Sequence, residues 1–276
     1  MRTRLFNRLT NREVESYLAR RDVIFVPVGT VEMHGALPLD CETVLPEAIA
    51  LLLAQKADGL VLPNLPYFFP GATANGRGTI NISIRDGMEY LRAITKALMK
   101  IGFRRIIYVS YHAPSKLTIE PVARDLFAET HMPLVYMDAF MMLYNYMQTP
   151  EGSNINLEGE HETDIHLAAY DILGHLDDVP ITDSPEMDCS APSVDSIRPF
   201  NGLFRLAGAW PFYYGDESDH LPTPVIPSAE VRAERARLGR AILEQFVDWV
   251  NIADAVELMN KGDAYHQDLF QKFPWL

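Results

Sequence analysis

The sequence predicts an α/β fold in which a mostly parallel β-sheet carries helices on both faces. Several short apolar runs, the first at residues 23–28, show no alternation of polar and apolar side chains. Uninterrupted runs of this kind are typical of strands that are buried on both faces. The runs alternate along the chain with segments of helical periodicity, which is the order that βαβ units produce.

The first half of the chain contains a helix, two strands and two further helices. Thr10 and Glu13 have the spacing of a capping box, so a short helix is expected to begin there. Strands are predicted at 23–28 and 60–62, with a helix over about 43–57 between them. Asp86, with Glu89, is expected to cap the next helix, which ends at Gly102 because glycine is favoured just past a helix end.

The second half continues the same alternation. Strands are predicted at residues 106–109 and 134–137, and a helix over about 117–129 lies between them. Helical spacing of apolar residues returns at about 160–173 and at about 230–250. Four strands that alternate with helices therefore predict βαβ units, a mostly parallel sheet and helices on both faces.

Length and composition predict one domain over residues 1–276, with an irregular insertion at about 175–227. A layered α/β fold of this size can be built around one sizeable core. The insertion holds eight of the 19 prolines together with Trp210 and Phe212. Long irregular segments of compact domains are usually lids, binding loops or subunit contacts, so one of these is expected. A solvated excursion is the alternative.

Charge and cysteine content exclude several classes of function. The formal net charge is −13, which disfavours binding to nucleic acid but suits a cation. No run approaches the ~18 apolar residues of a membrane span, and the N-terminus lacks the apolar stretch of a signal peptide. The two cysteines, Cys41 and Cys189, are far apart and form no metal-binding CxxC pair, so a reduced, cytoplasmic setting is expected.

Ionisable side chains gather just after the first predicted strand, and ligands in parallel sheets bind at the carboxyl ends of strands. Glu32, His34, Asp40 and Glu42 lie within eleven residues. In an extended segment Glu32 and His34 point the same way, and carboxylate with imidazole suits zinc, manganese or iron. Alternatively, Glu32 and His34 form a surface pair and Glu42 caps the next helix.

Two further segments carry candidate ligands. His112 directly follows the strand at 106–109, although a histidine there can also be purely structural. Residues 159–164 begin a helix, where acidic side chains are also favoured by the helix dipole. Glu162 and His166 stand four residues apart on one face of that helix, as a second ligand pair or as part of a polar stripe.

These residues resemble the signature of the creatininase (creatinine amidohydrolase) family. The run PVGTVEMHG at 27–35, followed by LPL at 37–39, ET at 42–43 and EAIA at 47–50, is similar to the family pattern PxGxxExHGxHLPLxxDTxxxxAxA. Gly78-Thr79 resembles the family's glycine–threonine segment. His112 stands where the family has the histidine of its GHGGN motif, and Glu162-Thr163 matches its Glu-Thr-Ser helix start.

The resemblance implies a three-layer α/β/α sandwich, homo-oligomers that are often hexamers, and two divalent metals, zinc, manganese or iron. It implies that Glu32 and His112 bind one metal, that His34 and Glu162 bind the other, and that Glu42 bridges them. The loop has one residue fewer than the family pattern, so Asp40 is an alternative bridge. Pro114 stands where creatininase has a metal-binding glutamate, and the GHGGN motif is reduced to Tyr111-His112-Ala113-Pro114-Ser115.

The resemblance further implies a hydrolase in which a hydroxide shared by the two metals attacks a carbonyl carbon. His161 or Glu160 would protonate the leaving group, and Asn75, Arg77 and Tyr111 would contact a small polar substrate. A cyclic amide is the expected substrate. The alternatives are a cyclic diketone such as 3-dehydro-scyllo-inosose, which the family also includes among its substrates, or a non-catalytic binding or scaffold protein of the same fold.

Overall fold

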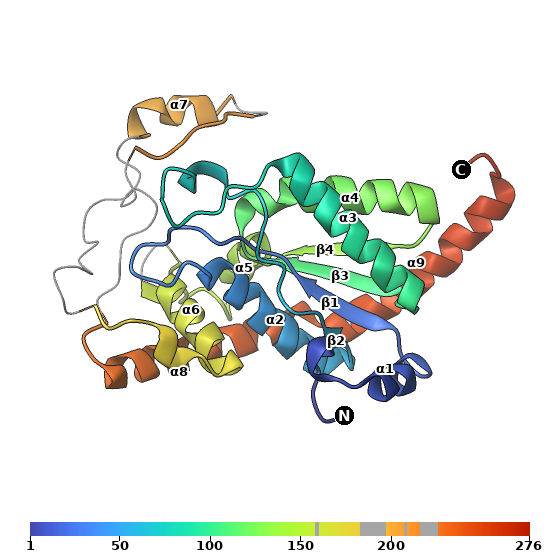
Figure 1. The fold of residues 1–276 in the computed structure, drawn as a ribbon, viewed down its shortest axis with the longest axis horizontal. Coiled ribbons are helices and arrows are strands. Elements are labelled where there is room, and N and C mark those ends of the chain that lie inside the picture. Colours follow the sequence, from blue (N-terminus) through green and yellow to red (C-terminus); the bar gives the residue numbers. More distant parts are fainter. Residues whose placement is uncertain (158–159, 183–196, 207–208, 216–225) are drawn as a thin grey trace.

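A four-stranded parallel sheet forms the centre of the protein (Figure 1). The computed structural model describes residues 1–157, 160–182, 197–206, 209–215 and 226–276. The strands run in the order β2-β1-β3-β4, and every pair of neighbours is parallel. The four predicted strands are confirmed as β1 (Val23–Pro27), β2 (Leu60–Val61), β3 (Arg105–Ser110) and β4 (Leu134–Asp138).

Strand β1 supplies apolar side chains to both faces of the sheet. Val23 and Phe25 pack into one hydrophobic core, whereas Ile24 and Val26 pack into the other. All four side chains are fully buried. The uninterrupted apolar run is thus the consequence of alternate residues facing two separate cores.

Helices cover both faces of the sheet, so the predicted α/β/α sandwich is confirmed (Figure 1). One core lies beneath α1, α3 and α4, and the other beneath α2, α5, α6, α8 and α9. The helices span α1 (Asn11–Leu18), α2 (Cys41–Ala57), α3 (Ile84–Ile101), α4 (Lys116–Thr130), α5 (Ala139–Met147), α6 (Glu160–Leu173), α7 (Asn201–Phe204), α8 (Ala229–Val250) and α9 (Ile252–Lys272). Short 3-10 turns are η1 (Phe6–Arg8), η2 (Gly71–Thr73), η3 (Ala113–Ser115), η4 (Leu176–Asp178) and η6 (Arg198–Phe200).

Helix starts agree with the sequence at one position and differ at another. The capping box is confirmed, because the Thr10 side chain accepts from the Glu13 amide and the Glu13 side chain accepts from the Thr10 amide. The predicted cap of the third helix is wrong. Ser83 caps α3, since its extended backbone brings its hydroxyl oxygen within 3.1 Å of the Asp86 amide. Helix α3 therefore begins at Ile84, before Asp86.

Outside the insertion, helices α5 and α9 have no counterpart in the sequence prediction; within it lies the four-residue helix α7. The α5 segment, AFMMLYNYM, is apolar on almost every side, so it shows no helical period. Helix α9 has the opposite composition, with only Ile252, Val256 and Met259 buried. Asn251 separates α9 from α8 by adopting a left-handed conformation with φ of 48°.

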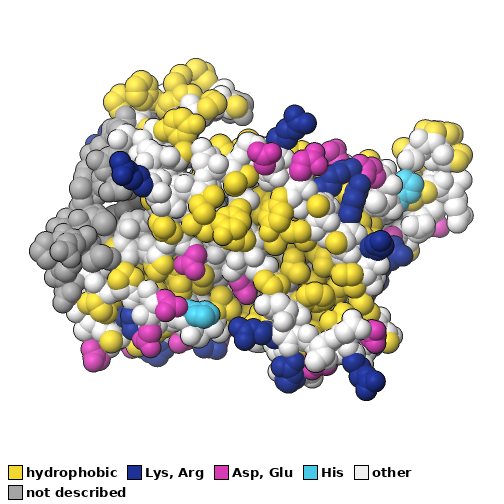
Figure 2. Space-filling model, viewed as in Figure 1, with side chains coloured by type: hydrophobic (Ala, Val, Ile, Leu, Met, Phe, Trp, Pro, Cys, Tyr) yellow, Lys and Arg dark blue, Asp and Glu magenta, His cyan; other side chains and the backbone are white. Residues whose placement is uncertain are grey.

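Part of the predicted insertion at 175–227 is ordered into an arm, which we define as residues 198–206 and 209–215. Trp210 and Phe212 stack in it with ring centroids 4.9 Å apart. The Tyr214 amide ties the arm to η2 by donating to the Ala72 carbonyl at 3.1 Å. Figure 2 shows hydrophobic side chains gathered where α7 projects, and Leu206 there is 81% exposed. Residues 183–196, 207–208 and 216–225 of the insertion lie outside the described residues.

The strand order also locates the edge at which a ligand is expected. From β1 the chain moves outward to β2, then returns to the other side of β1 to form β3 and β4. The direction therefore reverses between β1 and β3, and crevices at such switch points lie outside the carboxyl ends of the strands. No helix in the described part of the chain is long and apolar enough to cross a membrane.

Candidate metal centre

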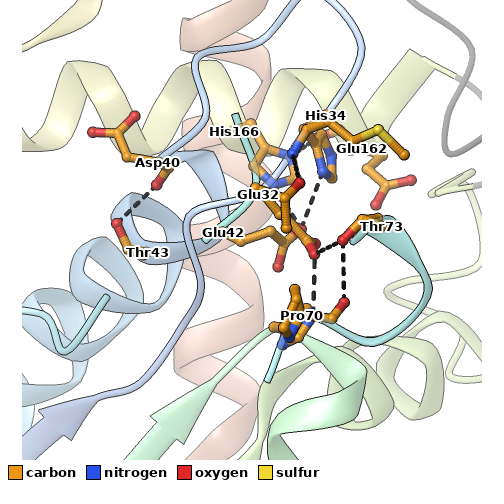
Figure 3. Close-up of polar contacts among 12 residues, drawn as sticks. Glu32, His34, Asp40, Glu42, Thr43, Pro70, Thr73, Glu162 and His166 are labelled. Carbon is orange, nitrogen blue, oxygen red and sulfur yellow. Dashed lines mark hydrogen bonds and ion pairs between the residues drawn. The ribbon is translucent and has the colours of Figure 1, made fainter. Parts of the chain in front are cut away.

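Four of the five predicted ligands meet at this switch point. Glu32 and His34 lie on the loop after β1, Glu42 lies in the first turn of α2, and His112 follows β3. Helix α6 brings His166 to the same place. Figure 3 shows Glu32, His34, Glu42 and His166 pointing toward one another. The side chains are almost completely removed from solvent, with exposed fractions from 0% for His166 to 6% for His112.

Glu32 and His112 form one side of this cluster. His112 Nε2 lies 3.5 Å from Glu32 Oε1, and the Thr73 hydroxyl donates to Glu32 Oε2. His112 Nδ1 lies 3.0 Å from Ser115 Oγ, which fixes the orientation of the ring. Outer hydrogen bonds of this kind hold metal-binding side chains in place. Sequence reasoning missed Thr73 and Ser115; Thr73 is distant in the chain and carries no motif.

His34, Glu42 and His166 form the other side. Glu42 Oε1 lies 3.7 Å from His34 Nδ1 and 3.6 Å from His166 Nε2. The thiol of Cys41, which is fully buried, completes a group of four donor atoms that all lie within 4.8 Å of one another. The sequence indicated His166 only as one member of a pair with Glu162, and it gave no sign that Cys41 belongs to the cluster.

The pKa values of the two central carboxyl groups shift in opposite directions. Burial, reinforced by the charge of Glu42, raises the pKa of Glu32 well above its usual value. Burial acts in the same direction on Glu42, but the neighbouring His166, His34 and His112 outweigh it and hold the pKa of Glu42 at about 2. Two carboxyl groups that cannot both ionise comfortably favour a bound cation that neutralises them.

The structure separates Glu42 from the alternative bridge, Asp40. Asp40 is exposed, its carboxylate accepts a hydrogen bond from the Tyr170 hydroxyl, and it points away from the cluster in Figure 3. Glu162 lies to one side of the cluster, and it is not one of the four residues whose donor atoms gather within 4.8 Å. Burial raises the pKa of Glu162 to about 7 against the opposing effect of His166.

The remaining predicted site residues fall into three situations. Asn75 and Arg77 are exposed on a loop that is tied to the metal loop, since the Ile80 amide donates to the Val31 carbonyl at 2.9 Å. Tyr111 is buried with its ring edge-on to His166 at 5.8 Å. His161 accepts a 2.8 Å hydrogen bond at Nδ1 from the Asn156 amide. The side chain of Glu160 lies outside the described residues. The roles of these residues in substrate binding and proton transfer stay predictions.

Gly29 allows the metal loop and helix α2 to meet. A Cβ atom at Gly29 would lie 2.9 Å from Thr43 Cα and nearer still to the carbonyl group of Glu42. These are backbone atoms, which cannot rotate away as a side chain would. The absence of a side chain at position 29 therefore keeps Glu42 close to the end of β1.

Gly29→Ala is expected to lower the free energy of unfolding by about 2 kcal/mol, because the added methyl group overpacks a rigid contact. It should also weaken zinc binding, since Glu42 must move. Urea unfolding and zinc titration measure the two effects. Gly202→Ala is the matched control, because a Cβ atom there meets nothing within 4 Å. Equal stabilities of the two variants would show that the contact at Gly29 is unimportant.

The donor set fits divalent metal ions. Glu42 Oε2 and His166 Nε2 are buried and have no hydrogen-bond partner among the described residues. Buried polar atoms without partners are rare and point to a missing ligand or ion. Carboxylates and imidazoles are the ligands that zinc and manganese take in proteins. Glu32, His34, Glu42 and His112, with a ligand from α6, would therefore hold the predicted ions.

Fold and cluster together define a class: an α/β/α sandwich with a buried carboxylate–imidazole group at the switch point of its parallel sheet. Within that class, the family model for creatininase (creatinine amidohydrolase) matches residues 7–194. The chain belongs to the creatininase family. Members of the family are hydrolases, and solved structures of creatininase include a manganese form and a zinc–zinc form.

Individual relatives are distant. The chain is 28% identical over 125 residues to creatinine amidohydrolase of Pseudomonas putida, covering 40% of this chain and 45% of that one. It is 26% identical over 126 residues to 3-dehydro-scyllo-inosose hydrolase of Thermotoga maritima, covering 45% of this chain and 40% of that one. The matched regions thus span less than half of each curated relative.

The solved structures extend the similarity of fold over nearly the whole chain. A crystal structure of creatininase superposes with a TM-score of 0.64 at 20% identity, covering 93% of this chain and 97% of that chain. The manganese form gives a TM-score of 0.62 at 22% identity, covering 92% and 98%. At these identities the likeness establishes the fold, and the reaction has to be argued from the cluster.

Proposed function

We propose that this protein is a metal-dependent hydrolase that opens a small polar cyclic substrate, a cyclic amide, in the cytoplasm. The observation that carries the proposal is the convergence of Glu32, His34, Glu42 and His112, four buried ligand-type side chains from three separate segments. Burying carboxylates is costly unless they are neutralised or coordinate metal, so their gathering at the ligand-binding edge of the sheet favours a catalytic centre.

The residues on the β3 side would hold one ion through Glu32 and His112, and those on the α2 side would hold the other through His34 and a residue of α6. Glu42 lies between them and would contact both. When bound, the two divalent ions supply Lewis acidity towards the substrate carbonyl and lower the pKa of a water molecule towards neutrality. Thr73 and Ser115 keep Glu32 and His112 in position for that work.

Proton transfer to the leaving nitrogen falls to a residue at the start of α6. His161 or Glu160 would donate this proton, because each lies close in sequence to Glu162 and carries a titratable group. Asn75, Arg77 and Tyr111 would orient the polar groups of the substrate. The apolar arm around α7 would serve as a subunit contact in a homo-oligomer, a hexamer by resemblance to the family, because exposed apolar patches commonly mark interfaces.

A cyclic diketone is the second candidate substrate. The match to 3-dehydro-scyllo-inosose hydrolase favours it, as does Pro114 at a position where creatininase has a carboxylate ligand. The same carbonyl attack would then break a carbon–carbon bond and release an enolate, which picks up a proton.

The proposal is tested by incubating the zinc- or manganese-loaded full chain with cyclic amides, formamides and inositol-derived ketones, and detecting products by mass spectrometry. A product that has gained one water identifies the substrate. Glu32→Gln and His112→Ala should then lower kcat/KM by about 10³-fold or more, because metal catalysis contributes several kcal/mol.

Two exposed residues of the same types give the controls, Glu89→Gln on α3 and His175→Ala after α6. Both should keep full activity. Turnover that survives Glu32→Gln and His112→Ala would remove these two residues from the reaction. A chain that gains no thermal stability from zinc or manganese and converts none of these compounds would instead be a scaffold of the same fold.

A further inference from the structure

We infer that the ion on the α2 side is held by His34, Cys41, Glu42 and His166. His166, one helical turn further along α6, takes the place expected for Glu162. The thiolate of Cys41 is an additional ligand. This inference rests on the proposed metal-dependent function. It deepens that function by fixing the ligand set and, with it, the kind of metal that the protein prefers.

The four donor atoms lie close enough together to share one ion. One donor atom from each of the four residues lies within 4.8 Å of every other. A zinc ion with N, O and S ligands at its usual bond lengths places neighbouring donors about 3.3–3.6 Å apart. Small side-chain rotations would close this gap, since Glu42 Oε1 already lies 3.7 Å from His34 Nδ1 and 3.6 Å from His166 Nε2.

His166 is oriented as metal-binding histidines usually are. Its Nδ1 lies 2.8 Å from the backbone carbonyl of Glu162, one turn earlier in α6, so the Nδ1 hydrogen is donated there. Nε2 then faces Glu42 Oε1 at 3.6 Å and has no hydrogen-bond partner among the described residues. A second-shell bond to a carbonyl that fixes the ring tautomer is the usual companion of a metal-bound imidazole. The Tyr111 ring packs against the His166 ring in a T-shaped contact and so helps to fix its orientation.

Cys41 is placed to supply the fourth ligand. It is the first residue of α2, directly before Glu42, and its side chain is fully buried. Burial and the charges of Glu42, Glu32 and Asp40 raise the pKa of this thiol in the metal-free chain, so the bound ion itself would have to stabilise the thiolate. Among the described residues, Cys41 is the cysteine of the cluster, and Cys189 lies outside them.

The inferred ligand set predicts a metal preference. A thiolate favours zinc and cobalt over manganese, which prefers oxygen ligands. The ion on the α2 side should therefore be zinc under competition, whereas the side formed by Glu32 and His112 has no sulfur ligand and accepts either metal. Cobalt(II), which substitutes for zinc, reports a bound thiolate directly by a sulfur-to-cobalt charge-transfer absorption in the near ultraviolet.

The experiment is a cobalt(II) titration of the full chain, followed by absorption spectroscopy. The wild type should develop the charge-transfer band, Cys41→Ser should lose it, and Cys189→Ser should keep it. His166→Ala and His166→Gln should weaken the affinity for this ion by more than about 100-fold, beyond the 10–100-fold typical of losing an outer-shell partner. Glu162→Gln and the exposed-site control His175→Ala should change it by less than about threefold.

Circular dichroism of the metal-free variants checks that each is folded. The affinity measurement uses whichever of the two His166 variants is folded. A wild-type complex without the band, or a loss of affinity in Glu162→Gln but not in a folded His166 variant, would overturn the inference. Hydrolysis without the band would leave the proposed function standing and this ligand set refuted. The charge-transfer band without hydrolysis of any tested compound would support this ligand set and refute the proposed hydrolase function.

Discussion

Glu42→Ala is expected to lower the affinity for divalent ions by more than about 100-fold, whereas Asp40→Ala should leave it within about threefold of the wild type. Glu42 is 4% exposed and faces the imidazoles of His34 and His166. Asp40 is exposed, and its carboxylate accepts a hydrogen bond from the Tyr170 hydroxyl. Removing Glu42 therefore takes away the buried carboxylate that faces both imidazoles of the α2 side, while removing Asp40 changes a contact at the surface of α2.

Zinc titration by calorimetry measures both variants on the full chain. Glu42→Gln accompanies them, because it keeps the volume and removes only the charge, and it should lose affinity as Glu42→Ala does. If Asp40→Ala lost more affinity than Glu42→Ala, the bridging position would move to Asp40. The one-residue deletion in the loop would then be absorbed by a movement of α2 that the structure does not show.

Gly239→Ala should lower the free energy of unfolding by about 3 kcal/mol or more, although alanine is the better helix former by about 1 kcal/mol. A Cβ atom at Gly239 would lie 2.7 Å from the backbone nitrogen of Ile165 and nearer still to the carbonyl group of Asp164. Helices α6 and α8 are in contact through their backbones at this point, so the methyl group must push them apart. His166, the next residue along α6, would move with them.

Gly262→Ala is the matched control, because Gly262 also lies inside a helix, α9, and a Cβ atom there meets nothing within 4 Å. It should leave stability unchanged or raise it by up to about 1 kcal/mol. Urea unfolding gives both values. A Gly239→Ala variant as stable as Gly262→Ala would mean that α6 and α8 separate without cost, and the fixed position of His166 would lose its support.

The layered fold could be predicted because its buried strands have a clear sequence signal. Residues 23–28 read as an uninterrupted apolar run only because a parallel strand feeds two cores at once. Helices α5 and α9 were not predicted. Helix α5 is apolar on nearly all sides, and helix α9 has few buried residues. Periodicity identifies a helix most readily by one apolar face, which α5 lacks. Helix α9 has such a face, since Ile252, Val256 and Met259 recur at helical spacing, but it was not predicted from the sequence.

The sequence was enough to predict which segments meet at the cluster. It was not enough to predict which side-chain atoms face one another there. Topology brings the ends of β1 and β3 together, so Glu32, His34 and His112 could be named from their positions after strands. Glu162 and His166 lie on one face of α6, one turn apart, so the choice between them depends on the position of α6 along its own axis, which the backbone contact with α8 at Gly239 helps to fix. Thr73 supports Glu32 from a segment with no sequence signal of its own.

Anomalous diffraction at the zinc absorption edge, from crystals of the full chain grown with zinc, tests the central claim most directly. Peaks are expected among Glu32, His34, Glu42 and His112, with both Glu42 carboxylate oxygens within bonding distance of an ion. A map without any anomalous peak at this end of the sheet, in zinc-soaked crystals of well-folded protein, would contradict the metal centre and the hydrolytic chemistry built on it.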